Sequence, residues 1–188
     1  DMETARSRIK DFSVSDTNKS SCVFASGDIQ HLPFEKNLYD AVICSEVLEH
    51  LESLDSAVSE LVRVLKPEGV LAVSVPRYLP ELICWKLSSA YSKTAGGHVR
   101  IFKQKELRKL IGKESVSYKS FHWAHALHSP YWWLRCIFWE REEEHWLVRK
   151  YHEFLVWDLM KNPLITRFLE MILKPLIGKS LVMYFVKD

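Results

Sequence analysis

"LYDAVICSEVLEHLESLDSAVSELVRVLKPEGVLAVSVP", residues 38–76, decides the fold of this chain. Two nearly continuous apolar runs, residues 38–45 and 70–76, flank a segment from Leu54 to Leu65 in which apolar residues recur at helical spacing. The pattern therefore predicts a buried strand, a helix that ends at "KPEG", and a second buried strand. A strand–helix–strand unit with short connections is typical of a parallel sheet covered by helices, so the predicted fold class is α/β.

The alternation of strands and helices extends to both sides of this unit. The sequence predicts further strands over residues 21–28, 115–123 and 179–187, and helices over residues 79–91 and 103–111. Residues 120–180 hold six of the seven tryptophans and have a helical pattern, which is too long for a hairpin loop. We therefore divide the chain into a partial core (1–121), an aromatic helical insertion or lid (122–177) and a closing strand (178–188).

The composition fits one globular domain. Of the 188 residues, 47% are hydrophobic and 27% are charged, which is ordinary for a soluble protein. The formal net charge is +2, but residues 1–94 carry 10 basic and 14 acidic side chains, whereas residues 95–188 carry 16 and 10. A basic second half suits an anionic substrate or a membrane surface, and a solvated basic face explains it equally well.

The cysteines and the apolar segments bear on localisation. Cys22, Cys44, Cys84 and Cys136 are widely spaced and form no CxxC pair, so the sequence favours neither a zinc site nor a disulfide framework. We interpret them as reduced core residues of a cytoplasmic protein. We find no signal-peptide pattern and no uncharged apolar run of about 18 residues. The sequence thus predicts a cytoplasmic protein, either soluble or associated with a membrane surface.

The longer segment "GDIQHLPFEKNLYDAVICSEVLEHLESLDSAVSELVRVLKPEGVLAVSVP", residues 27–76, resembles the class I S-adenosylmethionine-dependent methyltransferases, especially the type 11 group. The similarity continues more loosely through residues 96–111. The resemblance implies a Rossmann-like sheet, S-adenosyl-L-methionine as cofactor and methyl transfer as the reaction. It also implies that Asp28 accepts a hydrogen bond from the adenine amino group, that the Ile29 amide meets the ring, and that Ser45 and Glu46 lie beneath the methionine portion.

One part of the family pattern is missing. The family carries an acidic-x-Gly-x-Gly-x-Gly loop after its first strand, and the six glycines of this chain, at positions 27, 69, 96, 97, 112 and 178, do not form it. The resemblance then predicts a methyltransferase sheet that is incomplete at the N-terminus, with Asp1 as the acidic residue that holds the ribose. One interpretation is a fragment that is inactive alone.

Glu46, Glu49 and His50 lie at positions i, i+3 and i+4, so a helix would place all three on one face after the first buried strand. Three interpretations remain open. The first is a substrate-facing acid or base, with His50, Glu49 and His98 as catalytic residues. The second is helix capping and packing.

The third interpretation is a divalent-metal site. The E-x-x-E-H spacing is similar to that of metal-dependent O-methyltransferases of ubiquinone biosynthesis and of small-RNA 3′-end methylation, and His98 matches the further histidine of the RNA group. The ligands would then be Glu46, Glu49, His50 and His98. Carboxylates favour Mg²⁺, while imidazole also suits Zn²⁺ or Mn²⁺.

The aromatic insertion bears on the acceptor. Three histidines recur every three residues beside Trp and Tyr, at positions His122, His125 and His128. We interpret them either as metal ligands or as polar residues among core aromatics. The aromatic side chains could line a pocket for a lipid, sugar or aromatic acceptor, rest at a membrane interface, or pack on the sheet edge. We prefer a lid that contacts the acceptor.

These observations favour methyl transfer from S-adenosylmethionine to oxygen of a small-molecule or lipid- or glycan-linked acceptor. The main alternative is a non-catalytic methyltransferase-like module that serves as a binding or assembly surface. A nicotinamide-dependent oxidoreductase of Rossmann type fits less well, because "GDIQHLPF" and "LKPEGVLAVSVP" have no place in it. The sequence does not favour nucleic acid as a partner, since it has no basic stripe interleaved with stacking aromatics.

Overall fold

The two apolar runs of the strand–helix–strand unit form neighbouring parallel strands. The structure, a computed structural model, describes residues 25–141 and 145–188. Strand β1 (Tyr39–Ser45) pairs with β2 (Leu65–Pro76), and the crossover helix is α2 (Asp55–Val64). The predicted α/β class and the predicted helix are confirmed. Helix α2 packs one apolar stripe against the sheet, and this stripe includes Ala57, Val58, Leu61 and Val62.

Strand β2 begins five residues earlier than the sequence predicts. Leu65 already pairs with Tyr39, and the register shifts before Ala41 meets Val70. "KPEG" is therefore an irregularity within the strand, and Glu68 has a left-handed backbone with φ 63°. Gly69 is required here, because a Cβ atom would lie 2.8 Å from the backbone oxygen of Lys66.

We expect Gly69→Ala to destabilise the protein by about 1–3 kcal/mol, because backbone as well as side-chain atoms would have to move. Gly27→Ala is the matched control, since a Cβ atom there meets only the Pro33 ring, at 3.3 Å. Urea unfolding followed by circular dichroism measures both. Equal stability of the two variants would contradict the expectation.

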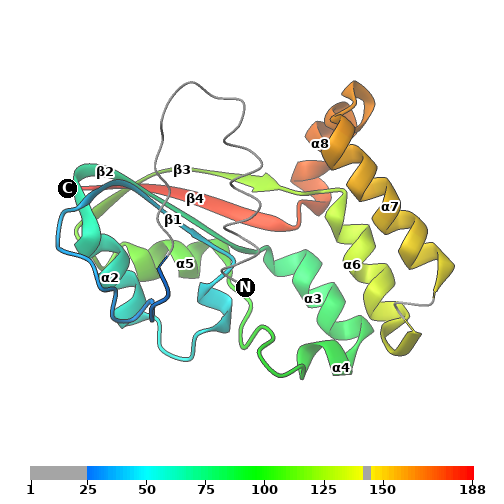
Figure 1. The fold of residues 1–188 in the computed structure, drawn as a ribbon, viewed down its shortest axis with the longest axis horizontal. Helices are drawn as coiled ribbons and strands as arrows, with labels where there is room; N and C mark the ends of the chain where they lie inside the picture. Colours follow the sequence, from blue (N-terminus) through cyan, green and yellow to red (C-terminus); the bar gives the residue numbers. More distant parts are fainter. Residues whose placement is uncertain (1–24, 142–144) are drawn as a thin grey trace.

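Strand β4 lies inside the sheet, between β2 and β3. It is antiparallel to β2 and also to β3, so the sheet order is β1-β2-β4-β3 and three strands run in one direction (Figure 1). The bounds of the last two strands are Val116–Ala124 for β3 and Ser180–Lys187 for β4. Both Pro76 and Ala124 are in register with Ser180. The carboxyl ends of β1, β2 and β3 therefore meet at one sheet edge, where open α/β sheets bind their ligands.

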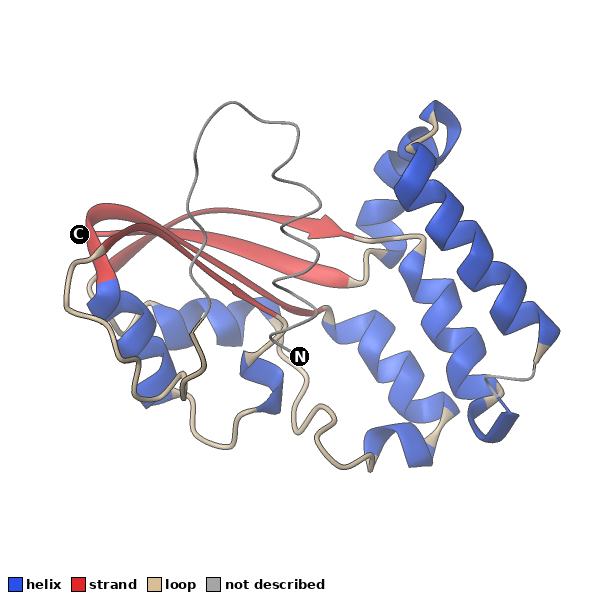
Figure 2. Cartoon of the chain, in the orientation of Figure 1, coloured by secondary structure: helices blue, strands red, loops and turns tan. Residues whose placement is uncertain are grey.

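The core lies between the sheet and the helices on one of its faces. Helices α2 and α5 (Gln104–Ile111) lie together under the sheet in the view of Figure 2. Inward residues of β2 and β4 pack against them, and these residues are Leu71, Val73, Val75, Leu181, Met183 and Phe185. At the other face, the edge strand β1 leaves Ile43 77% exposed among the described residues.

The remaining helices gather at one end of the sheet (Figure 1). They are α3 (Tyr78–Leu87), α4 (Ser89–Ser92), α6 (His128–Ile137), α7 (Trp146–Lys161) and α8 (Leu164–Ile177), with short 3₁₀ turns η2 (Leu48–His50) and η3 (Trp139–Arg141). The helical character predicted for the aromatic segment is thus present from His128 on, while residues 122–124 still belong to β3.

Two predicted elements differ from the structure. The helix predicted over residues 79–91 is broken at Ser88, whose backbone is extended. The Ser88 side-chain oxygen caps α4 by accepting a hydrogen bond from the Tyr91 amide at 3.1 Å. The strand predicted over residues 21–28 lies partly outside the described residues, and its described part has only an isolated bridge between Asp28 and His31. Among the described helices, none combines the length and apolar character needed to cross a membrane.

Candidate active site

The site begins at the end of β1, where the backbone takes an unusual conformation. Glu46 has φ 53°, and its amide donates to the Ser74 carbonyl at 3.0 Å. The Ser74 hydroxyl donates to Glu46 Oε1 at 2.9 Å and lies 3.0 Å from the Ser45 hydroxyl oxygen. A non-glycine residue in the left-handed region is uncommon and is often found at functional sites. The contacts to β2 hold Glu46 in this position.

Two cavities adjoin this turn. The first, about 630 Å³, is called the Ser45 cavity, and residues that line it include Gly27, Ile29, Phe34, Tyr39, Ala41 and Ser45. The second, about 530 Å³, is called the His98 cavity, and residues that line it include Glu46, Tyr91, His98, Trp132, Trp139 and Lys179. Adjacent residues Ser45 and Glu46 face different cavities and are linked through Ser74. The turn after β1 therefore forms the wall between two spaces of ligand size.

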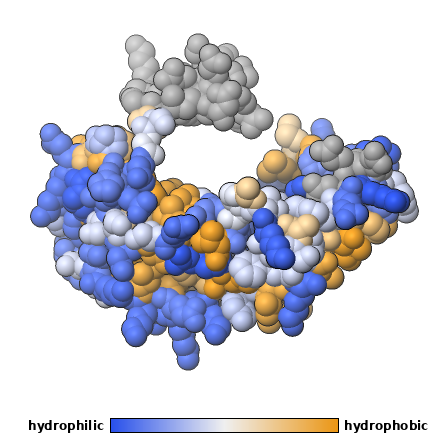
Figure 3. Space-filling model, turned by 90° about the horizontal axis from the view of Figure 1, so that it is seen from below, coloured by the Kyte–Doolittle hydropathy of each residue, from blue (hydrophilic) through white to orange (hydrophobic). Residues whose placement is uncertain are grey.

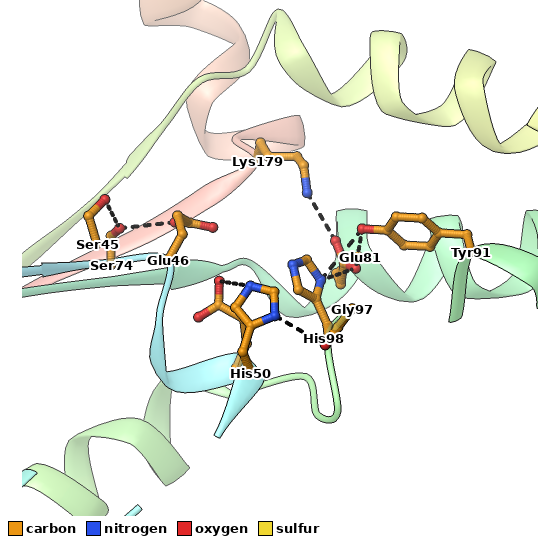
Figure 4. A network of polar contacts seen from close by, with 10 residues as sticks. Ser45, Glu46, His50, Ser74, Glu81, Tyr91, Gly97, His98 and Lys179 are labelled. Carbon is orange, nitrogen blue, oxygen red and sulfur yellow. Dashed lines mark hydrogen bonds and ion pairs between the residues drawn. The ribbon is translucent and has the colours of Figure 1, made fainter. Parts of the chain in front are cut away.

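A buried carboxylate organises the His98 cavity. Glu81 of α3 is 1% exposed, and both of its oxygens accept hydrogen bonds (Figure 4). Oε1 lies 2.6 Å from Nδ1 of His98 and 2.8 Å from the Tyr91 hydroxyl, which donates to it, and Oε2 accepts from Lys179 Nζ at 2.9 Å. Burial alone would raise the pKa of Glu81, but the His98 hydrogen bond and the Lys179 charge outweigh it and lower the pKa to about 2. The carboxylate is thus ionised at neutral pH.

This carboxylate fixes the orientation of His98. Since ionised Glu81 can only accept, the Nδ1 of His98 carries the proton and its Nε2 is left as an acceptor. Figure 4 shows this second nitrogen directed away from Glu81. Nδ1 of His50 lies 3.1 Å from the Gly97 carbonyl, which orients a second imidazole in the same way. The two rings lie 4.9 Å apart between centroids.

Glu49 is a buried acidic residue whose carboxylate has no hydrogen-bond donor among the described residues. It belongs to η2, and its side chain is fully buried. Burial raises its pKa to about 7, and the nearby carboxylates of Glu46 and Glu81 act in the same direction. An imidazole nitrogen of His50, Nε2, lies 3.9 Å from Glu49 Oε1. A buried carboxylate left in this state indicates a proton or a cation at the site.

Three of the four residues predicted as metal ligands meet. One donor atom from each of Glu49, His50 and His98 lies within 4.8 Å of the other two. Glu46 is not part of this cluster and instead accepts from Ser74. One carboxylate and two imidazoles, one of them fixed by Glu81, are a donor set that divalent cations use. The residues fit a cation, and a metal remains a prediction.

The predicted cofactor residues are distributed unevenly. Ile29 and Ser45 line the Ser45 cavity, whereas Glu46 lines the His98 cavity. The Asp28 side chain is 58% exposed, and its Oδ1 accepts from the Gln30 amide at 2.9 Å. Asp1 lies outside the described residues.

The three histidines of the aromatic segment do not come together as a metal site. His122 stacks on Tyr184, at 5.7 Å between ring centroids, while His125 and His128 contact each other and line the His98 cavity. Of the alternatives left open for them, the structure favours polar residues among aromatics.

Sequence reasoning missed Glu81, Tyr91 and Lys179. A signal was present for the first of them, since Glu81 is the one acidic residue in the apolar helix "YLPELICWKL" and stands at a position that faces the protein interior. Lys179 gave no such signal, because its partner lies 98 residues away in the chain. Tyr91 could not be separated from the many other aromatic residues.

Comparisons with known proteins find similarity to methyltransferases over part of the chain. Residues 2–73 match the family model described as "Methyltransferase domain". The chain is 34% identical over 95 residues to a sterol 24-C-methyltransferase of Schizosaccharomyces pombe, covering 50% of this chain and 23% of that protein. It is 39% identical over 51 residues to a ubiquinone biosynthesis O-methyltransferase of Rickettsia conorii, covering 27% and 17%. The chain thus spans about a quarter or less of these two relatives.

The fold is also similar to that of solved structures. A putative methyltransferase from Bacillus halodurans superposes with a TM-score of 0.58 at 18% identity, over 99% of this chain and 78% of that chain. At this identity the likeness concerns the fold alone. It confirms the Rossmann-like methyltransferase sheet that the sequence predicts.

Proposed function

We propose that the chain takes part in methyl transfer from S-adenosylmethionine to a small-molecule or lipid-linked acceptor, because residues 2–73 match a methyltransferase-domain model. The observation that carries this proposal is the pair of cavities on either side of the turn after β1. One cavity suits the cofactor and the other the acceptor. Ser45 and Glu46 are adjacent in the chain and line one cavity each, so ligands in the two cavities would have to meet at this turn.

The Ser45 cavity fits the cofactor. Its lining is mainly apolar and includes Ile29, Phe34 and Tyr39, which suits an adenine ring, while Ser45 offers a hydroxyl at the end nearest Glu46. When bound, S-adenosylmethionine supplies a methyl group that its sulfonium already activates. The protein then has to position the acceptor and remove a proton where the acceptor requires it.

The His98 cavity provides the group that can accept this proton. Nε2 of His98 is the free acceptor, and Glu81 holds the ring and stabilises the imidazolium that would form. A positioned base serves a hydroxyl that must lose its proton, and for this reason we favour oxygen as the receiving atom. The names of the two relatives differ on this point, since one is a C- and the other an O-methyltransferase. Both names support an acceptor of the lipid class.

The direct test is calorimetric titration of S-adenosylhomocysteine into the 188-residue chain and its variants. Ala41 lines the Ser45 cavity on β1, so Ala41→Trp should fill the cavity and abolish binding. Asp40→Trp is the matched control: this neighbouring side chain is exposed and contacts Lys66, so the variant should bind as the unmodified chain does. Asp28→Ala should weaken binding about 10- to 100-fold if its carboxylate meets the adenine amino group.

Two results would contradict the proposal. Binding that survives Ala41→Trp would place the ligand elsewhere. A folded chain that binds no S-adenosylhomocysteine would favour the alternative, a non-catalytic methyltransferase-like binding or assembly module.

A further inference from the structure

Helices α7 and α8 form a hairpin whose end and outer side expose large apolar side chains. Besides Trp146, six of these are more than 60% exposed, and they define what we call the α7–α8 apolar face: Leu159, Met160, Leu164, Ile165, Met171 and Leu176. Six such residues close together in two consecutive helices exceed the scattered exposure that is normal for a soluble surface. Figure 3 shows a different face, seen from below, on which hydrophobic patches also reach the end of the molecule that the helices form.

The charges of α8 are sorted by sign, while α7 also carries the acidic residues Glu153, which is 52% exposed, and Asp158. Arg167 on α8 and Lys161 at the end of α7 are exposed. Glu170, the acidic residue of α8, is instead turned toward the protein, where its oxygens accept from the Ala126 and Leu127 amides at 2.8 and 3.0 Å. The exposed charge of α8 is therefore positive. This combination of apolar and cationic residues complements an anionic lipid surface.

Two features of the helices fit a position at such a surface. Trp146 and Trp157 of α7 are 61% and 45% exposed, and tryptophan is enriched where membrane and water meet. Helix α8 has 14 residues, so its length is about 21 Å, which is shorter than the hydrocarbon layer of about 30 Å. A helix of this length would lie along the membrane surface.

A third cavity lies between the apolar face and the candidate active site. It measures about 590 Å³, and we call it the His152 cavity. Leu159 belongs both to its lining and to the α7–α8 apolar face. On its inner side, His125, His128 and Trp132 line this cavity and the His98 cavity alike. An apolar chain entering beside Leu159 would thus reach the three side chains that border both cavities.

We propose that the α7–α8 apolar face lies in the surface of an anionic membrane, and that the His152 cavity takes up the apolar tail of an acceptor from there. The second half of this inference rests on the proposed methyl transfer. The first half does not, because it concerns the affinity of the chain for lipid.

The experiment is flotation of the 188-residue chain with vesicles of phosphatidylcholine and phosphatidylglycerol, and with vesicles of phosphatidylcholine alone. We expect the chain to float with the anionic vesicles and less with the neutral ones. The double variant Leu164→Asp, Met171→Asp should reduce bound protein at least about 10-fold, since it removes two apolar side chains and adds two negative charges at exposed positions. Leu87→Asp, on exposed α3 surface, is the control and should float normally.

Three outcomes would overturn the membrane proposal. The first is a folded chain that floats with neither kind of vesicle. The second is a double variant that floats as well as the Leu87→Asp control. The third is the absence of vesicle binding together with a dimer, seen by light scattering, that the double variant Leu164→Asp, Met171→Asp makes monomeric. This result would assign the face to a second copy of the chain. Binding of S-adenosylhomocysteine, measured in the same preparations, reports on the proposed function independently.

Discussion

His98→Asn should lower the rate of methyl transfer about 10²- to 10⁴-fold, with little change in S-adenosylhomocysteine affinity. The range is that of a lost general base. Asparagine can still donate to Glu81 from its amide, but it offers no basic nitrogen in place of Nε2. The effect should fall on kcat, because the ring lines the acceptor cavity and not the Ser45 cavity. The measurement is transfer of a labelled methyl group, in the longest form of the protein that shows activity.

The control for this variant is His122→Asn. This histidine stacks on Tyr184 outside the His98 cavity, and its replacement should leave the rate unchanged. If a divalent cation bound by Glu49, His50 and His98 carries the function, treatment with a chelator should lower the rate as much as His98→Asn does, and Mg²⁺ or Zn²⁺ should restore it. A rate within about threefold of the unmodified protein, with and without chelator, would exclude His98 from the chemistry.

Glu81→Gln should destabilise the protein by about 3–5 kcal/mol at neutral pH. The substitution leaves the Lys179 ammonium, which is buried, without a counter-charge, and this is the costly way of breaking a buried pair. Glu106→Gln on α5 is the control, because its ion pair with Lys103 is exposed on both sides and should contribute between zero and about 1 kcal/mol. Urea unfolding at several pH values measures both.

The pH dependence gives this prediction a second readout. The pKa of Glu81 is lowered from 4.5 to about 2 in the folded protein, so its carboxylate stabilises the fold fully above pH 4.5. This contribution is lost as the pH falls from about 4.5 toward 2. The stability difference between the unmodified protein and Glu81→Gln should therefore narrow over that interval. A difference that stays constant with pH would show that Glu81 stabilises by packing and not by charge.

Local patterns predicted most of the sheet. The apolar runs from Ala41 to Cys44 and from Val70 to Val75 do form strands, although β1 is an edge strand that leaves Ile43 77% exposed, and α2 shows its helical spacing directly. The break at Ser88 could not be predicted in this way, because a serine within a helical pattern either continues the helix or caps the next one. Contacts of α3 and α4 with the rest of the protein decide between these outcomes.

The candidate site was predictable only in its local part. Glu46, Glu49 and His50 are close in sequence and directly follow a predicted strand. The pairing of Glu81 with Lys179 depends on β4 entering the sheet between β2 and β3, which no short segment of sequence specifies. The partner that fixes the charge of Glu81 was therefore missed. The residue that Glu81 orients, His98, was found through the family resemblance.

The position of β4 has a consequence for synthesis of the protein on the ribosome. Val70 of β2 pairs with Val186, and in the described residues β3 has no strand partner except β4. In a nascent chain that has emerged only as far as α8, β1 can already pair with β2. Within the described sheet, however, strand β3 and the second edge of β2 have no strand to pair with until β4 has emerged. Pairings so distant in sequence form slowly and leave strand edges open to aggregation. We expect the protein to depend on chaperones until residues 180–187 have left the exit tunnel, and Lys179 to reach Glu81 only at that stage.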